Sequence, residues 1–223
     1  MSPKAPPTGI HADQWAARVH PDEWTARVQL AACYRIFALL GWTEMIYNHI
    51  TLRLPDSVSG GDKQFLINPF GLHYSEVKAS NLVKVNLAGD ILDDSQHPIN
   101  PAGYLLHSTI HGGVDGAHCV MHTHTTAGVA VASLASGLSQ SNFYSAQLHD
   151  MVAYHDFEGI TIHAEEGPRV VASIGGGGPP LSPAARGALA LQAAARPESV
   201  PLRAVQARAG EPGAAALSPE GAA

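Results

Sequence analysis

The sequence predicts an α/β domain in which helices cover a mixed central sheet. Residues 21–40 have an amphipathic helical pattern, and residues 49–54 alternate polar and apolar side chains as a strand does. Strand and helix patterns then alternate to about residue 162. Such alternation along one chain is typical of a layered α/β fold.

The first predicted helix covers residues 21–40. Asp22 and Glu23 suit the positive end of the helix dipole, and Gly41 ends the pattern. Apolar side chains at helical spacing form a stripe that we expect to face the core: Val28, Ala32, Ile36, Leu39 and Leu40.

The next segments predict a β-hairpin. Ile50, Leu52 and Leu54 alternate with polar residues, a Gly/Ser/Asp turn follows at 55–62, and residues 64–68 return as a second strand. A short helix capped by Ser75 should run to Leu82, and residues 84–92 should continue the sheet around a turn at 88–90.

Three later elements complete the predicted domain. A helix from Pro101 to Ile110 begins with proline in its first turn, where the missing N–H costs nothing. A buried strand is expected at 117–120, and residues 126–132 should form a helix that leaves its end.

The composition divides the chain into three parts. Residues 1–20 form a Pro-containing lead-in that we expect to be mobile, residues 21–174 form the domain, and residues 175–223 form a tail. In this tail, 30 of the 49 residues are Ala, Gly or Pro, so we expect disorder. Two explanations of this composition are open. The tail is either a different reading frame joined to a C-terminally incomplete domain or a natural Ala/Pro-rich tail.

Charge and hydropathy argue against several partners. The net charge is −6, and no cluster of lysine or arginine offers a footprint for nucleic acid. No run of 18 apolar residues predicts a membrane span, and the first residues lack the apolar core of a signal peptide. Cys33 and Cys119 lie in apolar segments, so we expect buried, reduced thiols in a cytoplasmic protein.

The segment 121–125 reads Met-His-Thr-His-Thr and predicts the candidate site. A two-residue step in a strand brings the side chains of His122 and His124 to the same face, at the junction of strand and loop. Two neutral imidazoles that converge can bind a divalent metal ion. The alternative is a pair of histidines hydrogen-bonded at a strand end.

Four motifs in order give the chain a family resemblance. They are Gly-Trp at 41–42 leading to Asn-His-Ile-Thr at 48–51, Ile-Asn-Pro-Phe-Gly-Leu-His-Tyr at 67–74, Ile-Asn-Pro-Ala-Gly-Tyr at 99–104 with Leu-His-Ser at 106–108, and the His-Thr-His segment. Together they resemble the class II aldolase/adducin family, in its subgroup similar to the adducin head domain. The resemblance implies a three-layer α/β/α domain with a mixed central sheet.

The resemblance also implies site residues. His122 and His124 match two of the three histidines that hold a divalent metal, usually zinc, in the family's enzymes. The third, in an Asn-His-Gly triplet, does not occur in the sequence, and Gly103 stands where those enzymes carry an acid/base glutamate. The loops that would cradle the phosphate or carboxylate end of a substrate contain Asn48, Thr51, Asn68 and Gly71.

Other residues near these motifs have simpler interpretations. Residues 68–71 can equally be a tight turn between strands. His107 and His111 share one helical face, which we expect to be a surface or partly buried polar face. His155 is expected to be structural.

The sequence is compatible with three candidate functions of different classes. The first is a metal-dependent aldehyde lyase or epimerase that acts on a small hydroxylated carbonyl compound similar to a sugar phosphate. The second is a non-catalytic, adducin-like domain that associates with itself or with a protein of the actin cytoskeleton, and the third is an inactive truncated product. By resemblance we expect a homo-oligomer. From the charge and hydropathy of the chain we expect no nucleic-acid or membrane partner.

Overall fold

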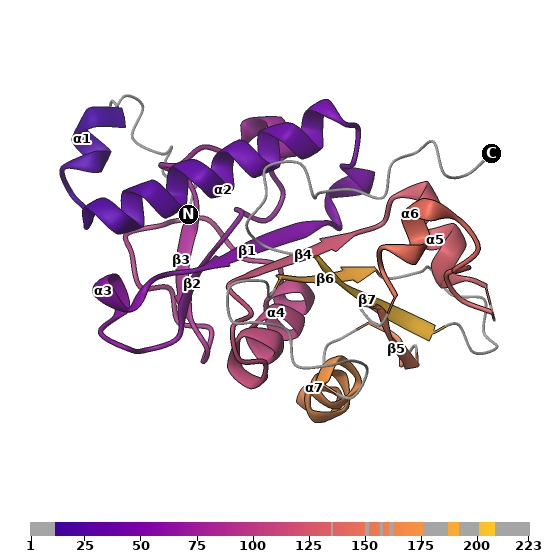
Figure 1. Ribbon diagram of the computed structural model, residues 1–223. Coiled ribbons are helices and arrows are strands. Elements are labelled where there is room, and N and C mark those ends of the chain that lie inside the picture. Colours follow the sequence, from indigo (N-terminus) through magenta and orange to yellow (C-terminus); the bar gives the residue numbers. More distant parts are fainter. Residues whose placement is uncertain are drawn as a thin grey trace.

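The strands in the described part of the chain form one seven-stranded sheet, seen in the computed structural model of Figure 1. The structure describes residues 12–134, 136–149, 152–156, 158–160, 163–175, 187–191 and 201–207. The strands are β1 (His49–Arg53), β2 (Gln64–Ile67), β3 (Val83–Asn86), β4 (Cys119–Thr123), β5 (Val152–Asp156), β6 (Gly187–Leu191) and β7 (Pro201–Ala207).

The helices differ widely in length. The α-helices are α1 (Ala12–Ala16), α2 (Pro21–Leu39), α3 (Asp56–Ser59), α4 (Pro101–Gly113), α5 (Thr126–Ala132), α6 (Phe143–Ala146) and α7 (Gly167–Gly175). Short 3₁₀ helices are η1 (Glu44–Ile46), η2 (Tyr74–Glu76) and η3 (Ala164–Glu166).

The sheet is mixed and lies between two layers of helix. Its strand order is β3-β2-β1-β4-β6-β7-β5, with β4 and β6 parallel and the other neighbouring pairs antiparallel. Helix α2 covers one face, and α4 with α7 covers the other (Figure 1). The predicted α/β fold with a mixed sheet is therefore confirmed, as is the hairpin of β1 and β2.

Helix α2 buries a different face from the one predicted. Its core side chains include Leu30, Tyr34 and Phe37, which pack with Ile50 and Leu66 of the sheet. The predicted stripe was wrong, because its members are exposed, from Val28 at 46% to Leu39 at 85%. The sequence misleads because the buried face also carries the charged Glu23 and Arg27.

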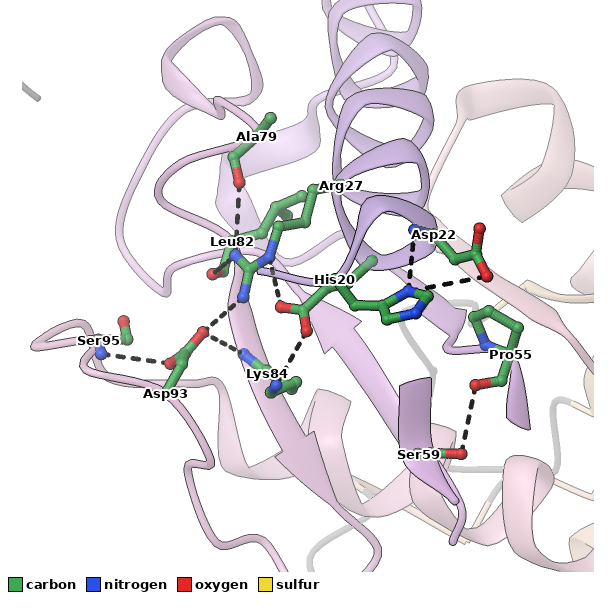
Figure 2. A network of polar contacts seen from close by, with 11 residues as sticks. His20, Asp22, Arg27, Pro55, Ser59, Ala79, Leu82, Lys84, Asp93 and Ser95 are labelled. Atoms are coloured by element: carbon green, nitrogen blue, oxygen red, sulfur yellow. Dashed lines mark hydrogen bonds and ion pairs between the residues drawn. The ribbon is translucent and has the colours of Figure 1, made fainter. Parts of the chain in front are cut away.

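Arg27 joins α2 to the far edge of the sheet through a buried ion network, drawn in Figure 2. Its guanidinium lies 2.9 Å from the Glu23 carboxylate and 2.7 Å from that of Asp93, and it donates to the Leu82 carbonyl at 2.7 Å. Lys84 lies 2.9 Å from the other Glu23 oxygen. Each charge is thus paired, which allows a fully buried arginine in the core.

On the opposite face, α4 packs against the sheet and α7. Leu106 and Ile110 of α4 contact Val120 of β4 and Val170 and Ile174 of α7. This face also carries the histidines described below. Apolar side chains therefore pack on both faces of the sheet at β1 and β4.

The short helix predicted from Ser75 to Leu82 is only the 3₁₀ turn η2. Its N-cap is His73, whose Nδ1 accepts from the Ser75 amide at 3.2 Å, while the Glu76 carboxylate accepts from the His73 amide at 2.8 Å. The turn ends early because the Asn81 side chain accepts from the Lys78 amide at 2.8 Å.

The structure places two strands in the segment predicted as a disordered tail. β6 pairs with β4 in parallel register, and β7 pairs with β6 and β5. Strand pairing uses backbone groups that every Ala and Gly supplies, so a composition poor in large side chains does not prevent it. The rest of the predicted tail after residue 175, and residues 1–11 of the predicted lead-in, lie outside the described residues.

Two further sequence expectations concern the environment of the chain. Among the described residues, none of the helices combines the length and apolar character that a membrane span requires. Cys33 and Cys119 are free thiols and are half-buried. Burial raises the pKa of Cys33 to about 11 and that of Cys119 to about 12, which keeps both protonated and unreactive.

Candidate functional site

The structure brings His122 and His124 together at the end of β4. Their Nε2 atoms lie 2.8 Å apart, and the two rings meet edge to face. His122 is 1% exposed, and its Nδ1 has no hydrogen-bond partner among the described residues. This is a hydrogen-bond distance, so the structure shows the hydrogen-bonded histidine pair, and it also brings both nitrogens to one place at the strand end, as the two-residue spacing predicts.

Neighbouring residues fix the backbone at this point. The side-chain oxygen of Asn48 accepts from the His124 amide at 2.9 Å, which joins the end of β4 to the start of β1. Thr125 caps helix α5 by accepting from the Gly128 amide at 3.2 Å. The chain thus passes from strand to helix directly after the two histidines, and their side chains stay at the strand end.

A third imidazole, that of His49, covers His122. The two residues are direct partners in the antiparallel pairing of β1 and β4, so their side chains share one face of the sheet. Their rings stack with centroids 4.5 Å apart and planes at 9°. No local pattern in the sequence indicates this contact, because the two positions lie 73 residues apart.

From His49, a chain of polar contacts runs inward beneath α4. Nδ1 of His49 lies 2.8 Å from Nε2 of His107, and the Thr51 hydroxyl lies 2.7 Å from both Nδ1 of His107 and Nε2 of His111. Nδ1 of His111 lies 2.8 Å from the Ala117 carbonyl. Each side-chain polar atom of Thr51, His107 and His111 therefore has a partner.

The expectation that His107 and His111 form a surface or partly buried polar face was wrong. Both side chains are fully buried, because the face of α4 that carries them packs against β1. Their i, i+4 spacing was a usable signal, and so was the polar face of the neighbouring strand, where His49 and Thr51 alternate. What the sequence could not supply was that the two faces meet.

The buried imidazoles are held neutral. Burial lowers the pKa of His49, His107 and His122 well below the usual value, and neighbouring histidines lower it further. Burial also lowers the pKa of His111, to about 4, despite its hydrogen bond to Ala117. At neutral pH the cluster is therefore an uncharged set of nitrogen donors and acceptors.

Gly103 lies directly against His49. A Cβ built on Gly103 would stand 2.5 Å from Cδ2 and 2.6 Å from Nε2 of the His49 ring, closer than real contacts allow. The glycine is therefore a steric requirement of this site. The imidazole of His49 occupies the space beside the α4 backbone into which a larger residue at 103 would project.

The four residues predicted to bind substrate do not form one group. Asn48 donates to the Glu44 carboxylate at 2.7 Å, and Thr51 is buried among the histidines. Asn68 is buried with its oxygen 3.0 Å from the Tyr34 hydroxyl, whereas Gly71 is exposed with φ of +94°. Their role in substrate binding stays a prediction.

His122 and His124 supply two nitrogen ligands for a divalent metal. Among the described residues, no group of three or more His, Cys, Asp or Glu side chains is arranged to hold a metal ion. His155, the next buried histidine after this pair along the chain, has its Nδ1 3.0 Å from the Ser173 hydroxyl. The described pair therefore fits two positions of a metal site and leaves the third without a protein ligand.

Fold and site together define an α/β domain with a mixed sheet and a pair of histidines at the end of one strand. Residues 28–191 match the description "Class II Aldolase and Adducin N-terminal domain". The chain belongs to the class II aldolase/adducin family.

The relatives include both bacterial proteins and adducins. A Caulobacter vibrioides protein named for aldolase class 2 is 46% identical over 162 residues, which cover 73% of this chain and 58% of that protein. Alpha-adducin of Mus musculus is 48% identical over 140 residues, which cover 62% of this chain and 18% of the adducin. The chain thus spans less than two-thirds of the length of these relatives.

A solved structure supports the same fold. An aldolase II superfamily protein from Pseudomonas syringae is 39% identical with a TM-score of 0.71, over 85% of this chain and 69% of that one. L-fuculose 1-phosphate aldolase from Glaciozyma antarctica PI12 is 24% identical with a TM-score of 0.61, over 90% of this chain and 68% of that one. The second likeness concerns the fold alone.

Proposed function

We propose that the protein is a metal-dependent lyase or epimerase that acts on a small hydroxylated carbonyl compound of the sugar-phosphate type. The observation that carries this proposal is the 2.8 Å approach of the Nε2 atoms of His122 and His124 within a buried, neutral imidazole cluster. Neutral imidazole nitrogen is a preferred ligand of zinc and related divalent metals.

In this proposal His122 and His124 hold the metal ion. A bound divalent ion would polarise a substrate carbonyl and stabilise the negative charge that develops on its oxygen. A third ligand would have to come from outside the described pair. We therefore expect the affinity of the chain for metal to be low.

The chain's own residues shape the site around that position. The stacked ring of His49 keeps the ring of His122 in place, and Asn48 fixes the backbone of His124. Asn48, Asn68 and Gly71 remain proposed ligand-binding positions, of which Gly71 offers exposed backbone. Thr51, the fourth predicted position, is buried among the histidines and would act on a ligand only through them. Glycine at such a position lets an anion approach main-chain N–H groups closely.

A second candidate is an adducin-like association domain. The 48% identity with mouse alpha-adducin favours it, and so does Gly103, which leaves the site without a carboxylate at this position. In that function the histidine cluster would stabilise the fold and would not act on a substrate.

One experiment separates the two candidates. Aldehyde release from a panel of hydroxyketose phosphates is measured with added zinc, cobalt or manganese, for the full chain and for the double variant His122→Ala/His124→Ala. The lyase proposal expects metal-dependent turnover that the double variant loses, while His163→Ala, at an exposed histidine of the same chain, keeps it. Turnover that is absent with every metal would favour the association domain, whereas equal turnover in the double variant would show that His122 and His124 do not hold the metal.

A further inference from the structure

The hydrogen bonds beneath α4, which run from His49 to Ala117, have a fixed order of donors and acceptors. The atoms at the Ala117 end determine this order. A carbonyl oxygen can only accept, so Nδ1 of His111 carries the proton that is donated to Ala117, 2.8 Å away. Since His111 is neutral, its Nε2 accepts, and the Thr51 hydroxyl must donate to it.

The same reasoning continues outward to His49. The Thr51 hydroxyl has one proton, which it gives to His111, so its oxygen accepts from Nδ1–H of His107. Neutral His107 then accepts at Nε2, and Nδ1–H of His49 donates to it. Three neutral imidazoles and one hydroxyl therefore allow only one arrangement of protons in which all four contacts are hydrogen bonds.

At the outer end, this arrangement leaves a lone pair on Nε2 of His49. None of the hydrogen bonds in the described part of the chain involves this atom. Nε2 of His49 lies on the edge of the ring that faces Gly103. The same ring stacks on the ring of His122. The lone pair is therefore beside the two histidines that converge at the strand end.

We propose that Thr51, His107 and His111 are positioning residues that hold His49 in the Nδ1–H form, so that its Nε2 accepts a hydrogen bond from a hydroxyl group of the ligand. The imidazole serves as the polar group on the side where Gly103 offers no side chain. The inference rests on the proposed function only in the choice of ligand, a hydroxylated carbonyl compound.

The proton arrangement is tested without any ligand by ¹⁵N NMR of the histidine side chains in the full, metal-free chain at pH 7. His49→Gln assigns the His49 resonances. We expect a protonated Nδ1 and an unprotonated Nε2 at His49, unchanged in Thr51→Ser, which keeps the hydroxyl. In Thr51→Val, which removes the hydroxyl at nearly equal volume, His49 should show a mixture of both forms.

The ligand role is tested by saturating the same samples with zinc and then adding dihydroxyacetone phosphate, with shifts measured against zinc alone. The Nε2 resonance of His49 should shift, and the dissociation constant should rise about tenfold in Thr51→Val but not in Thr51→Ser, as expected for one weakened hydrogen bond. Protonated Nε2 in the free protein, or identical spectra of the Val and Ser variants, would overturn the positioning role. Shifts at His122 and His124 without one at His49 would overturn the acceptor role alone, and no shift anywhere would overturn it together with the proposed function.

Discussion

The buried histidines should make the protein unusually sensitive to mild acid. The perturbation is a change from pH 7 to pH 5, applied to the wild-type chain and to His111→Gln. In the folded protein the pKa of His111 is lowered to about 4, whereas in the unfolded chain it returns to its ordinary value of 6.5. The unfolded state therefore binds more protons in this window, so this group favours unfolding as the pH falls.

The magnitude follows from these two pKa values. The contribution of His111 is complete above pH 6.5, declines as the pH falls, and levels off below pH 4, where both states are protonated. Between pH 7 and pH 5 its loss amounts to about 2 kcal/mol. Burial lowers the pKa of His49, His107 and His122 as well, so the whole cluster should lose more than this.

The assay is urea unfolding followed by far-UV circular dichroism at half-unit steps of pH. We expect the free energy of unfolding of the wild type to fall by at least about 2 kcal/mol from pH 7 to pH 5, and by about 2 kcal/mol less in His111→Gln. Val170→Ala, which weakens the core beside α4 without touching a histidine, should be less stable but keep the wild-type pH dependence. A wild type whose stability is constant over this range would refute the argument that the cluster is neutral because it is buried.

Three other changes have expected outcomes. Gly103→Ala should lower the free energy of unfolding by about 1–3 kcal/mol, because the added methyl group clashes with His49. Gly112→Ala in the same helix meets only Leu87, at 3.5 Å, and should raise the free energy of unfolding by about 0.5–1 kcal/mol. Equal effects of the two changes in urea unfolding would contradict the close contact between Gly103 and His49. Arg27→Met should cost about 3–5 kcal/mol by leaving buried carboxylates short of a partner, while Arg169→Met, at an exposed ion pair, should leave the thermal midpoint nearly unchanged. After dialysis against zinc, elemental analysis should find well under one ion per chain and none in His122→Ala/His124→Ala; a full equivalent in the double variant would show that the ligands lie elsewhere.

Local patterns predicted the elements whose signals are local. The bounds of α2, the hairpin of β1 and β2, and the helix that begins at Pro101 follow from caps, turns and periodicity. The approach of His122 to His124 likewise follows from a two-residue step in a strand.

What the sequence could not predict depends on contacts between distant segments. The stacking of His49 on His122 requires the register of β1 against β4, and the burial of His107 and His111 requires α4 to pack on that face. Strand β6 was missed because its Ala-rich segment has little side-chain signal, while its pairing with β4 is made by the backbone. The pattern of α2 favours the exposed stripe because the core face carries Glu23 and Arg27, whose distant charged partners the sequence does not reveal.

The contact between His49 and Gly103 makes these two positions dependent on each other during evolution. A relative that gains a glutamate at the position of Gly103 must first lose the large ring at the position of His49, because one volume cannot hold both side chains. Across family members the two positions should therefore vary together, a histidine with a glycine and a small residue with an acid. Members that carry both the large ring and the acid would need a different backbone separation between β1 and α4.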